Sequence, residues 1–417
     1  MHYRHSFPKI ALTLIATLAA SFLAAQSHPA NYNNEGVAAY KAGNFAEAIR
    51  QFEQAYKEAP DSAVVRRNLC NAYQSEANAL ALNNDFRNAI RYVEAAIDVD
   101  PRNPSPVIQL GSYYLRTDNL DAAIDRLEEA IVLKPGDLTA HELLGQAYYQ
   151  DNDLSSARAQ WDYVLEIEPN RPGLNEKYEK AFREESVEYD FNRWKSRHFR
   201  ISYPPKVPAS LRSSVFSILD RAYVDIGRQL GGIYPPPPIH VILYTAEQFS
   251  EATQLEGHVG AVYDGKIRAP LTDSEGNWLS NQELERRLTH EYVHVAVRHV
   301  AGANIPWWLN EGLAETLSKS LSNNDVRRLR EHFNRGGEMS LASLEANQIN
   351  RLDPSSLRLA YLKSHATVTL LWDRYGRNKM IGLLRALGDG MGYESALQAT
   401  YRRGYALIER DVTGIYR

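Results

Sequence analysis

The chain has 417 residues, of which 44% are hydrophobic and 24% are charged, and its formal net charge is −4. This length allows two or more domains with packed cores. The slightly acidic balance gives no electrostatic case for binding nucleic acid, which proteins hold largely through basic side chains.

The segment 1–27 has the layout of a secretory signal peptide. His2, Arg4 and Lys9 precede an apolar run over positions 10–25, and small residues follow at a cleavage position near Ser27. The alternative is an uncleaved membrane anchor, but this apolar run is short for a span. We therefore expect an exported protein, in the periplasm or cell envelope or secreted, with no stable membrane span after cleavage.

Its single cysteine, Cys70, cannot form an internal disulfide, so packed cores must provide the stability.

Segment 31–170 is an internal repeat. Prolines recur in one register and alanines in another, and the two sets keep the same intervals. These residues are Pro60, Pro101, Pro135 and Pro169, and Ala48, Ala89, Ala123 and Ala157. The last two intervals match the period of about 34 residues that is the signature of the tetratricopeptide (TPR) helix–turn–helix unit. We predict about four repeats stacked into an all-α superhelix. Because the first interval is longer, we expect lengthened helices in the second repeat, around positions 74–83.

Such a superhelix has a concave face that usually binds a peptide or a protein. We expect a protein partner on this face. The alternative is an array that only orients the domain that follows it.

The second half of the chain predicts an α+β domain over residues 191–417, after a connecting helix or linker at 171–190. Alternating apolar residues indicate strands at 198–203 and 239–244, with a helix over 209–230 between them. His240 alternates with the apolar positions of its strand, so we expect its side chain on the solvent side. An Asp-Gly pair predicts a short hairpin over 260–268.

The pattern H-E-x-x-H lies at positions 290–294, within a helical stretch. His290 and His294 are one helical turn apart, so both imidazoles can reach one Zn²⁺ ion. Glu291 lies beside them as a candidate general base for an attacking water. The segment between His294 and Glu311 is long enough for a helix–turn–helix to return the Glu311 carboxylate to the metal as third ligand. Glu315, one turn later, can accept a hydrogen bond from a ligand histidine and orient it.

A further helix over residues 355–375 places Tyr361 and His365 on one face, one turn apart. Either side chain could donate a hydrogen bond to a developing oxyanion, and we favour Tyr361 over His365. The alternative for a tyrosine on an apolar helix face is a packing role in the core.

These residues resemble the gluzincin clan of zinc metallopeptidases. Residues 308–314, W-L-N-E-G-L-A, are similar to the aminopeptidase segment that supplies the third ligand. Residues 360–366, A-Y-L-K-S-H-A, are similar to the helix start whose tyrosine steadies the tetrahedral intermediate, although His365 stands where the family usually has a small residue. The resemblance covers about residues 188–417 and is closest to minimal peptidase MA-like domains attached to repeats in bacterial envelope proteins. It implies a zincin-like fold after the superhelix and a substrate-pairing edge strand near residues 260–263. The alternative is a hairpin with a structural role alone.

The sequence therefore predicts an exported zinc metallopeptidase whose TPR repeats recruit a protein or peptide substrate or partner, with endopeptidase preferred over aminopeptidase. One alternative is a TPR-based envelope binding or assembly factor whose zinc domain is structural or weakly active. Another is a pseudo-enzyme that never loads metal. The intact Glu291 favours the enzyme, because a purely structural site has no need of a general base.

Overall fold

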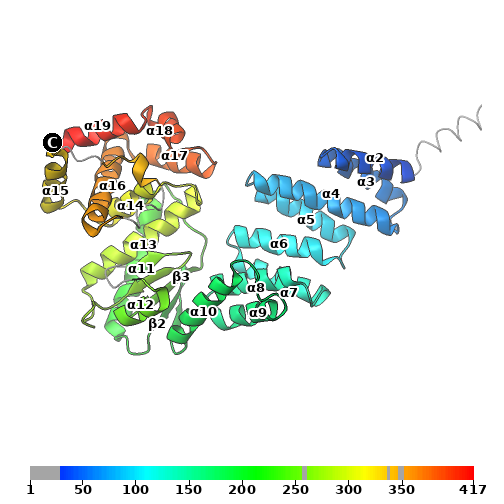
Figure 1. The fold of residues 1–417 in the computed structure, drawn as a ribbon, viewed down its shortest axis with the longest axis horizontal. Helices are drawn as coiled ribbons and strands as arrows, with labels where there is room; N and C mark the ends of the chain where they lie inside the picture. The colour runs from blue at the N-terminus through cyan, green and yellow to red at the C-terminus, as the bar shows by residue number, and fades with distance from the viewer. Residues whose placement is uncertain (1–28, 256–260, 336–338, 346–351) are drawn as a thin grey trace, which may run out of the picture. The chain divides into compact units, whose positions relative to one another are not determined.

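The structure is a computed structural model that describes residues 29–255, 261–335, 339–345 and 352–417 (Figure 1). The signal segment expected at 1–27 lies outside these residues. The chain divides into two compact units, Met1–Ala181 and Phe182–Arg417, with the division inside helix α10 (Leu174–Glu188). Within the described ranges, no helix has both the length and the apolar character needed to cross a bilayer.

The first unit consists of successive antiparallel helix pairs that follow the predicted repeats. The pairs are α2 (Pro29–Lys41) with α3 (Phe45–Glu58), α4 (Ala63–Leu82) with α5 (Phe86–Val99), α6 (Pro104–Arg116) with α7 (Leu120–Leu133), and α8 (Leu138–Gln150) with α9 (Leu154–Ile167). The four repeat alanines are fully buried, which lets paired helices approach closely. Helix α4 has 20 residues against 13 or 14 in the other repeat helices, which confirms the lengthened second repeat. Cys70 is buried in this unit, and its burial raises the pKa of the thiol to about 11.

The second unit contains a five-stranded mixed sheet in the order β1-β2-β3-β5-β4. Its strands are β1 (Asn192–Lys195), β2 (Phe199–Tyr203), β3 (Ile239–Tyr244), β4 (Val262–Tyr263) and β5 (Ile267–Pro270). The inner pairs β2–β3 and β3–β5 are parallel, and the outer pairs are antiparallel. Helix α11 (Ala209–Gln229) joins β2 to β3, and α12 (Ala246–Thr253) follows β3. The predicted fold class, an all-α repeat unit followed by an α+β unit, is confirmed.

The expectation that His240 faces solvent is wrong, because its side chain is only 7% exposed. Strand β3 is covered on both faces. Val241 and Leu243 join the main core, while Ile242 and Tyr244 pack with α12 on the other side. A central parallel strand has no solvent face, so the alternation of His240 with apolar residues could not reveal its environment.

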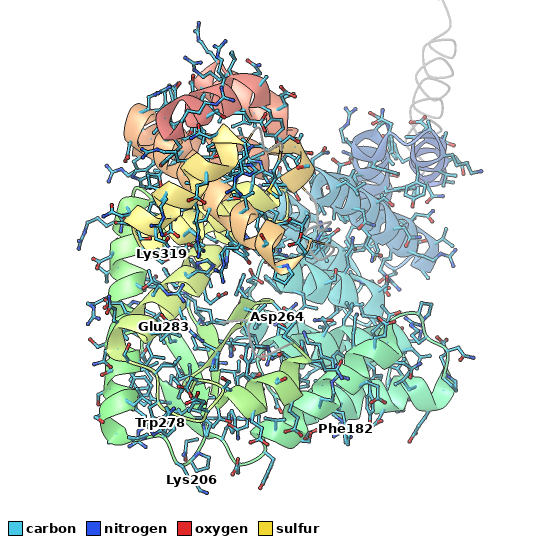
Figure 2. The ribbon with its side chains drawn as sticks, turned by 60° about the vertical axis from the view of Figure 1, so that its left-hand side comes forward. Phe182, Lys206, Asp264, Trp278, Glu283 and Lys319 are labelled. Atoms are coloured by element: carbon cyan, nitrogen blue, oxygen red, sulfur yellow. The ribbon has the colours of Figure 1, made fainter. Side chains whose placement is uncertain are left out.

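The predicted hairpin is present in residues 261–268, with Gly260 outside the described residues, and β4 is the outermost described strand of the sheet. Figure 2 labels Asp264 in its turn. The guanidinium of Arg268 on β5 is fully buried and ties this hairpin to α10. It contacts Glu184 at 2.8 Å, Glu188 at 3.3 Å and Asp264 at 3.3 Å, and it donates to the Tyr244 hydroxyl at 2.6 Å. This network compensates the buried charges and fixes the edge of the sheet.

Helices make up the rest of the second unit. They are α13 (Asn281–Ala301), α14 (Trp307–Ser318), α15 (Asn323–Asn334), the short 3₁₀ helix η1 (Ala342–Leu344), α16 (Pro354–Tyr375), α17 (Arg377–Gly388), α18 (Tyr393–Tyr401) and α19 (Tyr405–Tyr416). Ser280 caps the start of α13, and Gly302 ends it with a φ of 61°. The chain turns after Gly302, and α14 then packs against α13.

Helices α14 and α16 cross at a point of close approach. A Cβ added at Gly312 would lie 2.5 Å from the backbone oxygen of Ser364, closer than side chains pack. Gly312 therefore lets the face of α14 that carries Glu311 and Glu315 lie close to the face of α16 that carries His365.

Candidate metal centre

Helix α13 carries the histidine pair of the candidate centre. His290 and His294 lie one turn apart, with ring centroids 4.9 Å apart and rings nearly perpendicular. Their side chains are 13% and 10% exposed, so both are largely shielded while a path to solvent remains. The regular helix keeps the two rings on one face.

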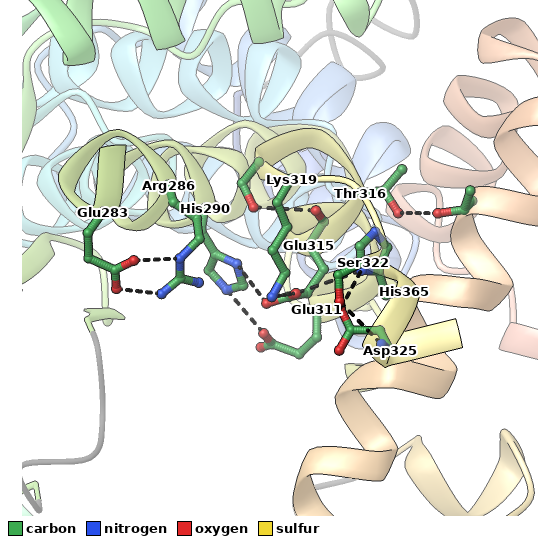
Figure 3. A network of polar contacts seen from close by, with 12 residues as sticks. Glu283, Arg286, His290, Glu311, Glu315, Thr316, Lys319, Ser322, Asp325 and His365 are labelled. Carbon is green, nitrogen blue, oxygen red and sulfur yellow. Dashed lines mark hydrogen bonds and ion pairs between the residues drawn. The ribbon is translucent and has the colours of Figure 1, made fainter. Parts of the chain in front are cut away.

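Helix α14 brings Glu311 to both rings. Its Oε2 atom lies 3.4 Å from Nε2 of His290 and 3.6 Å from Nε2 of His294 (Figure 3 draws His290 and Glu311). Two atoms that each lie about 2.1 Å from a tetrahedral zinc ion are about 3.4 Å apart. The separations of Glu311 from the two rings therefore fit a zinc ion held by His290, His294 and Glu311.

Glu291 is the alternative third ligand, because its ligand atom and those of His290 and His294 all lie within 4.8 Å of one another. Glu311 fits better, because its oxygen is near the tetrahedral distance from both Nε2 atoms. This leaves Glu291 adjacent to the ion position. That is the place a proton acceptor for an attacking water needs.

The pKa values of the two carboxylates, Glu291 and Glu311, are shifted in opposite directions. Burial raises the pKa of Glu291 to about 7, with His294 lowering it and Glu311 raising it further. Burial also disfavours the charged form of Glu311, but the facing His294 and His290 rings outweigh it and lower the pKa of Glu311. These opposite shifts favour a charged carboxylate at Glu311 and a carboxyl group at Glu291 that titrates near neutral pH.

Glu315 lies behind His290, as the spacing predicts. Its Oε1 atom is 3.5 Å from Nδ1 of His290, the ring nitrogen that faces away from Glu311. Nδ1 of His290 makes no hydrogen bond with any described residue, so this contact is electrostatic, and a carboxylate there favours the tautomer that leaves Nε2 unprotonated.

Tyr361 and His365 occupy different sides of this arrangement. The ring of Tyr361 packs edge-on against Trp307, with centroids 5.0 Å apart. Burial raises the pKa of Tyr361, and the nearby carboxylates of Glu311 and Glu291 raise it further, so it stays a hydrogen-bond donor beside the centre. His365 is 2% exposed, and its Nδ1 atom lies 3.8 Å from Oε2 of Glu315, the carboxylate that contacts His290.

Lys319 is a member of this network that the sequence analysis did not identify. Its ammonium lies 2.5 Å from Oε2 of Glu315. The sequence spacing could have predicted this contact, because a lysine four positions after a glutamate on a helix commonly forms an ion pair with it.

Comparison with known families agrees with this geometry. Residues 276–412 match the model of the Peptidase MA superfamily, and residues 29–62 and 108–173 match tetratricopeptide repeat models. The chain therefore carries TPR repeats followed by a Peptidase MA superfamily domain. The residues that match the peptidase model include every member of the candidate centre. The predicted architecture is confirmed.

Individual proteins are similar to part of this chain. The tetratricopeptide repeat domain-containing protein PYG7, chloroplastic, of Arabidopsis thaliana is 35% identical over 100 residues, and the match spans 23% of this chain and 33% of that protein. MamA from Desulfovibrio magneticus RS-1 is 19% identical, with a TM-score of 0.30 over 37% of this chain and 82% of the other. The first TPR domain of Spaghetti, solved with an HSP90 peptide, is 23% identical, with a TM-score of 0.27. The match covers 27% of this chain and 90% of the other. At these TM-scores the structural likenesses carry no further argument.

Proposed function

We propose that the chain is an exported zinc-dependent peptidase that hydrolyses peptide bonds in proteins or peptides. The observation that carries the proposal is the pair of distances from one Glu311 oxygen to Nε2 of His290 and of His294, 3.4 and 3.6 Å. The match to the Peptidase MA superfamily supports the same reaction class.

The reaction follows from where the side chains lie. A zinc ion on His290, His294 and Glu311 would polarise the scissile carbonyl and make a water acidic enough to attack it. Glu291 accepts a proton from the attacking water and delivers it to the leaving amine. Tyr361 donates a hydrogen bond to the oxygen on which negative charge develops.

The edge of the sheet offers a way to hold the substrate. Among the described residues β4 is the outermost strand of the sheet, a place where an extended peptide can add by backbone hydrogen bonds. Main-chain pairing of this kind suits an internal segment of a substrate, which is why we favour an endopeptidase. The repeats recruit the protein that carries this segment.

The test is hydrolysis of an unstructured protein by the purified chain before and after removal of metal by a chelator. We expect cleavage to stop without metal and to return when zinc is added. Glu311→Gln should bind zinc more weakly and lose activity. Glu283→Gln is the matched control, because it lies on α13 before the histidines and pairs with Arg286 (Figure 3), so it should remain active. Bound zinc with no cleavage by the wild type would favour a binding role led by the repeats.

A further inference from the structure

The carboxylate of Glu315 has its two oxygens committed to different neighbours. Oε1 faces the ring of His290 at 3.5 Å, whereas Oε2 faces Lys319 at 2.5 Å and His365 at 3.8 Å. Figure 3 shows the chain of contacts from His290 through Glu315 to Lys319 and His365. The orientation of the first oxygen therefore depends on what holds the second.

Lys319 supplies the charge that this position needs. The Glu315 side chain is 10% exposed, and a carboxylate buried to that extent is costly without a cation. Lys319 is the C-cap residue of α14, and its backbone N–H donates to the Glu315 carbonyl oxygen. Backbone and side chain together hold Lys319 over the last turn of the helix, where a cation also interacts favourably with the helix dipole.

His365 fixes the same turn from a second helix. Its ring faces the backbone of Lys319. Its Nδ1 atom is buried, has no hydrogen-bond partner among the residues the structure describes, and is directed at Oε2 of Glu315. His365 thus spans the gap between α16 and the end of α14, touching both the lysine backbone and the carboxylate.

We propose that Lys319 and His365 are positioning residues that hold Glu315 against His290 and thereby set the affinity of the centre for zinc. The proposal rests on the proposed function, because it takes His290 as a ligand. Their contacts run to Glu315 and not to the ligand rings, so the effect on the metal passes through that carboxylate. Residues behind a ligand histidine commonly change metal affinity by about 10- to 100-fold when they are removed.

The experiment measures the dissociation constant for zinc, by competition with a chelator, in the full chain and in four variants. Lys319→Met removes the charge, Lys319→Arg retains it, and His365→Gln keeps a polar side chain of similar size. Thr369→Val is the matched control. Thr369 lies one turn after His365 on α16, and its hydroxyl is 3.3 Å from that of Thr316, the residue after Glu315.

We expect Lys319→Met and His365→Gln to weaken zinc binding by about tenfold, Lys319→Arg to restore most of the loss, and Thr369→Val to bind as the wild type does. If the buried His365 variant unfolds, Lys319→Met decides alone, because that side chain is 35% exposed. Wild-type affinity in both variants would overturn the positioning role and leave the peptidase proposal standing. A wild type that binds no zinc would overturn both.

Discussion

The role of Tyr361 can be tested by removing a single oxygen atom, because only its hydroxyl is proposed to act. Its ring packs against Trp307, and phenylalanine keeps that contact. We expect Tyr361→Phe to bind zinc and to melt as the wild type does, while kcat falls by about 100-fold, as for loss of one oxyanion donor. Steady-state kinetics on an unstructured peptide measure this change. An unchanged kcat would assign Tyr361 to packing alone.

The buried Lys266 predicts how the stability of the protein depends on pH. It is 3% exposed, and burial, helped by the nearby Arg268, lowers the pKa of its ammonium from 10.5 to about 7. Between these values the unfolded chain keeps the proton that the folded chain has released, so this group makes folding more favourable as pH rises. Below pH 7 the folded protein bears the full cost of the buried charge.

Lys266→Met should therefore stabilise the protein by a few kcal/mol below pH 7, and the gain should shrink as pH rises from about 7 to about 10.5. Urea unfolding at several pH values measures the difference between variant and wild type. Lys206→Met, at an exposed position labelled in Figure 2, is the control and should show no such trend. A gain that is independent of pH would contradict the buried-charge account.

At the element scale, the crossing of α14 and α16 fixes the distance between the centre and the residues behind it. An alanine methyl at Gly312 would meet the backbone of Ser364 at 2.5 Å, and a backbone atom cannot turn away as a flexible side chain can. We expect Gly312→Ala to destabilise the protein by about 1 to 3 kcal/mol and to weaken zinc binding, because Glu311 and Glu315 flank the crossing.

Denaturant unfolding and zinc competition measure these two effects. Gly414→Ala is the control, because Gly414 lies within α19 and a Cβ added there would meet no described side chain or distant backbone atom within 4 Å, so this change should stabilise the protein slightly. If the two variants behaved alike, the helices would not be in close contact at Gly312.

The sequence predicts elements well where one local pattern decides them. The repeat period determines the helix pairs of the first unit, and the H-E-x-x-H spacing places His290 and His294 on one face of a helix. Glu311 required one further step, a helix–turn–helix return, which the length of the intervening segment allowed. The structure brings these three side chains together.

Other features depend on contacts between distant segments, and the sequence could not supply them. The burial of His240 follows from elements that cover both faces of β3. The charge of Arg268 is compensated by Glu188 and Glu184, which lie 80 and 84 positions away in the chain. Such pairings have no local period, so only the fold reveals them.

At the scale of the whole molecule, the first unit has buried apolar clusters of its own within residues 48–181, and the second unit has its own within residues 187–412. A ligand that binds only the folded second unit stabilises that unit by mass action, by about 2.7 kcal/mol at 100 times its dissociation constant. We expect calorimetry to show two transitions, of which zinc raises one and leaves the other unchanged. A single transition that zinc shifts as a whole would mean that the two units unfold together.

Glu291 is proposed to act as the base of a zinc peptidase without holding the metal. The most direct test compares wild type and Glu291→Gln for bound zinc and for cleavage of an unstructured protein. We predict stoichiometric zinc in both proteins, and cleavage by the wild type alone. Loss of zinc from Glu291→Gln would make Glu291 a ligand, and cleavage by Glu291→Gln at the wild-type rate would contradict the proposed mechanism.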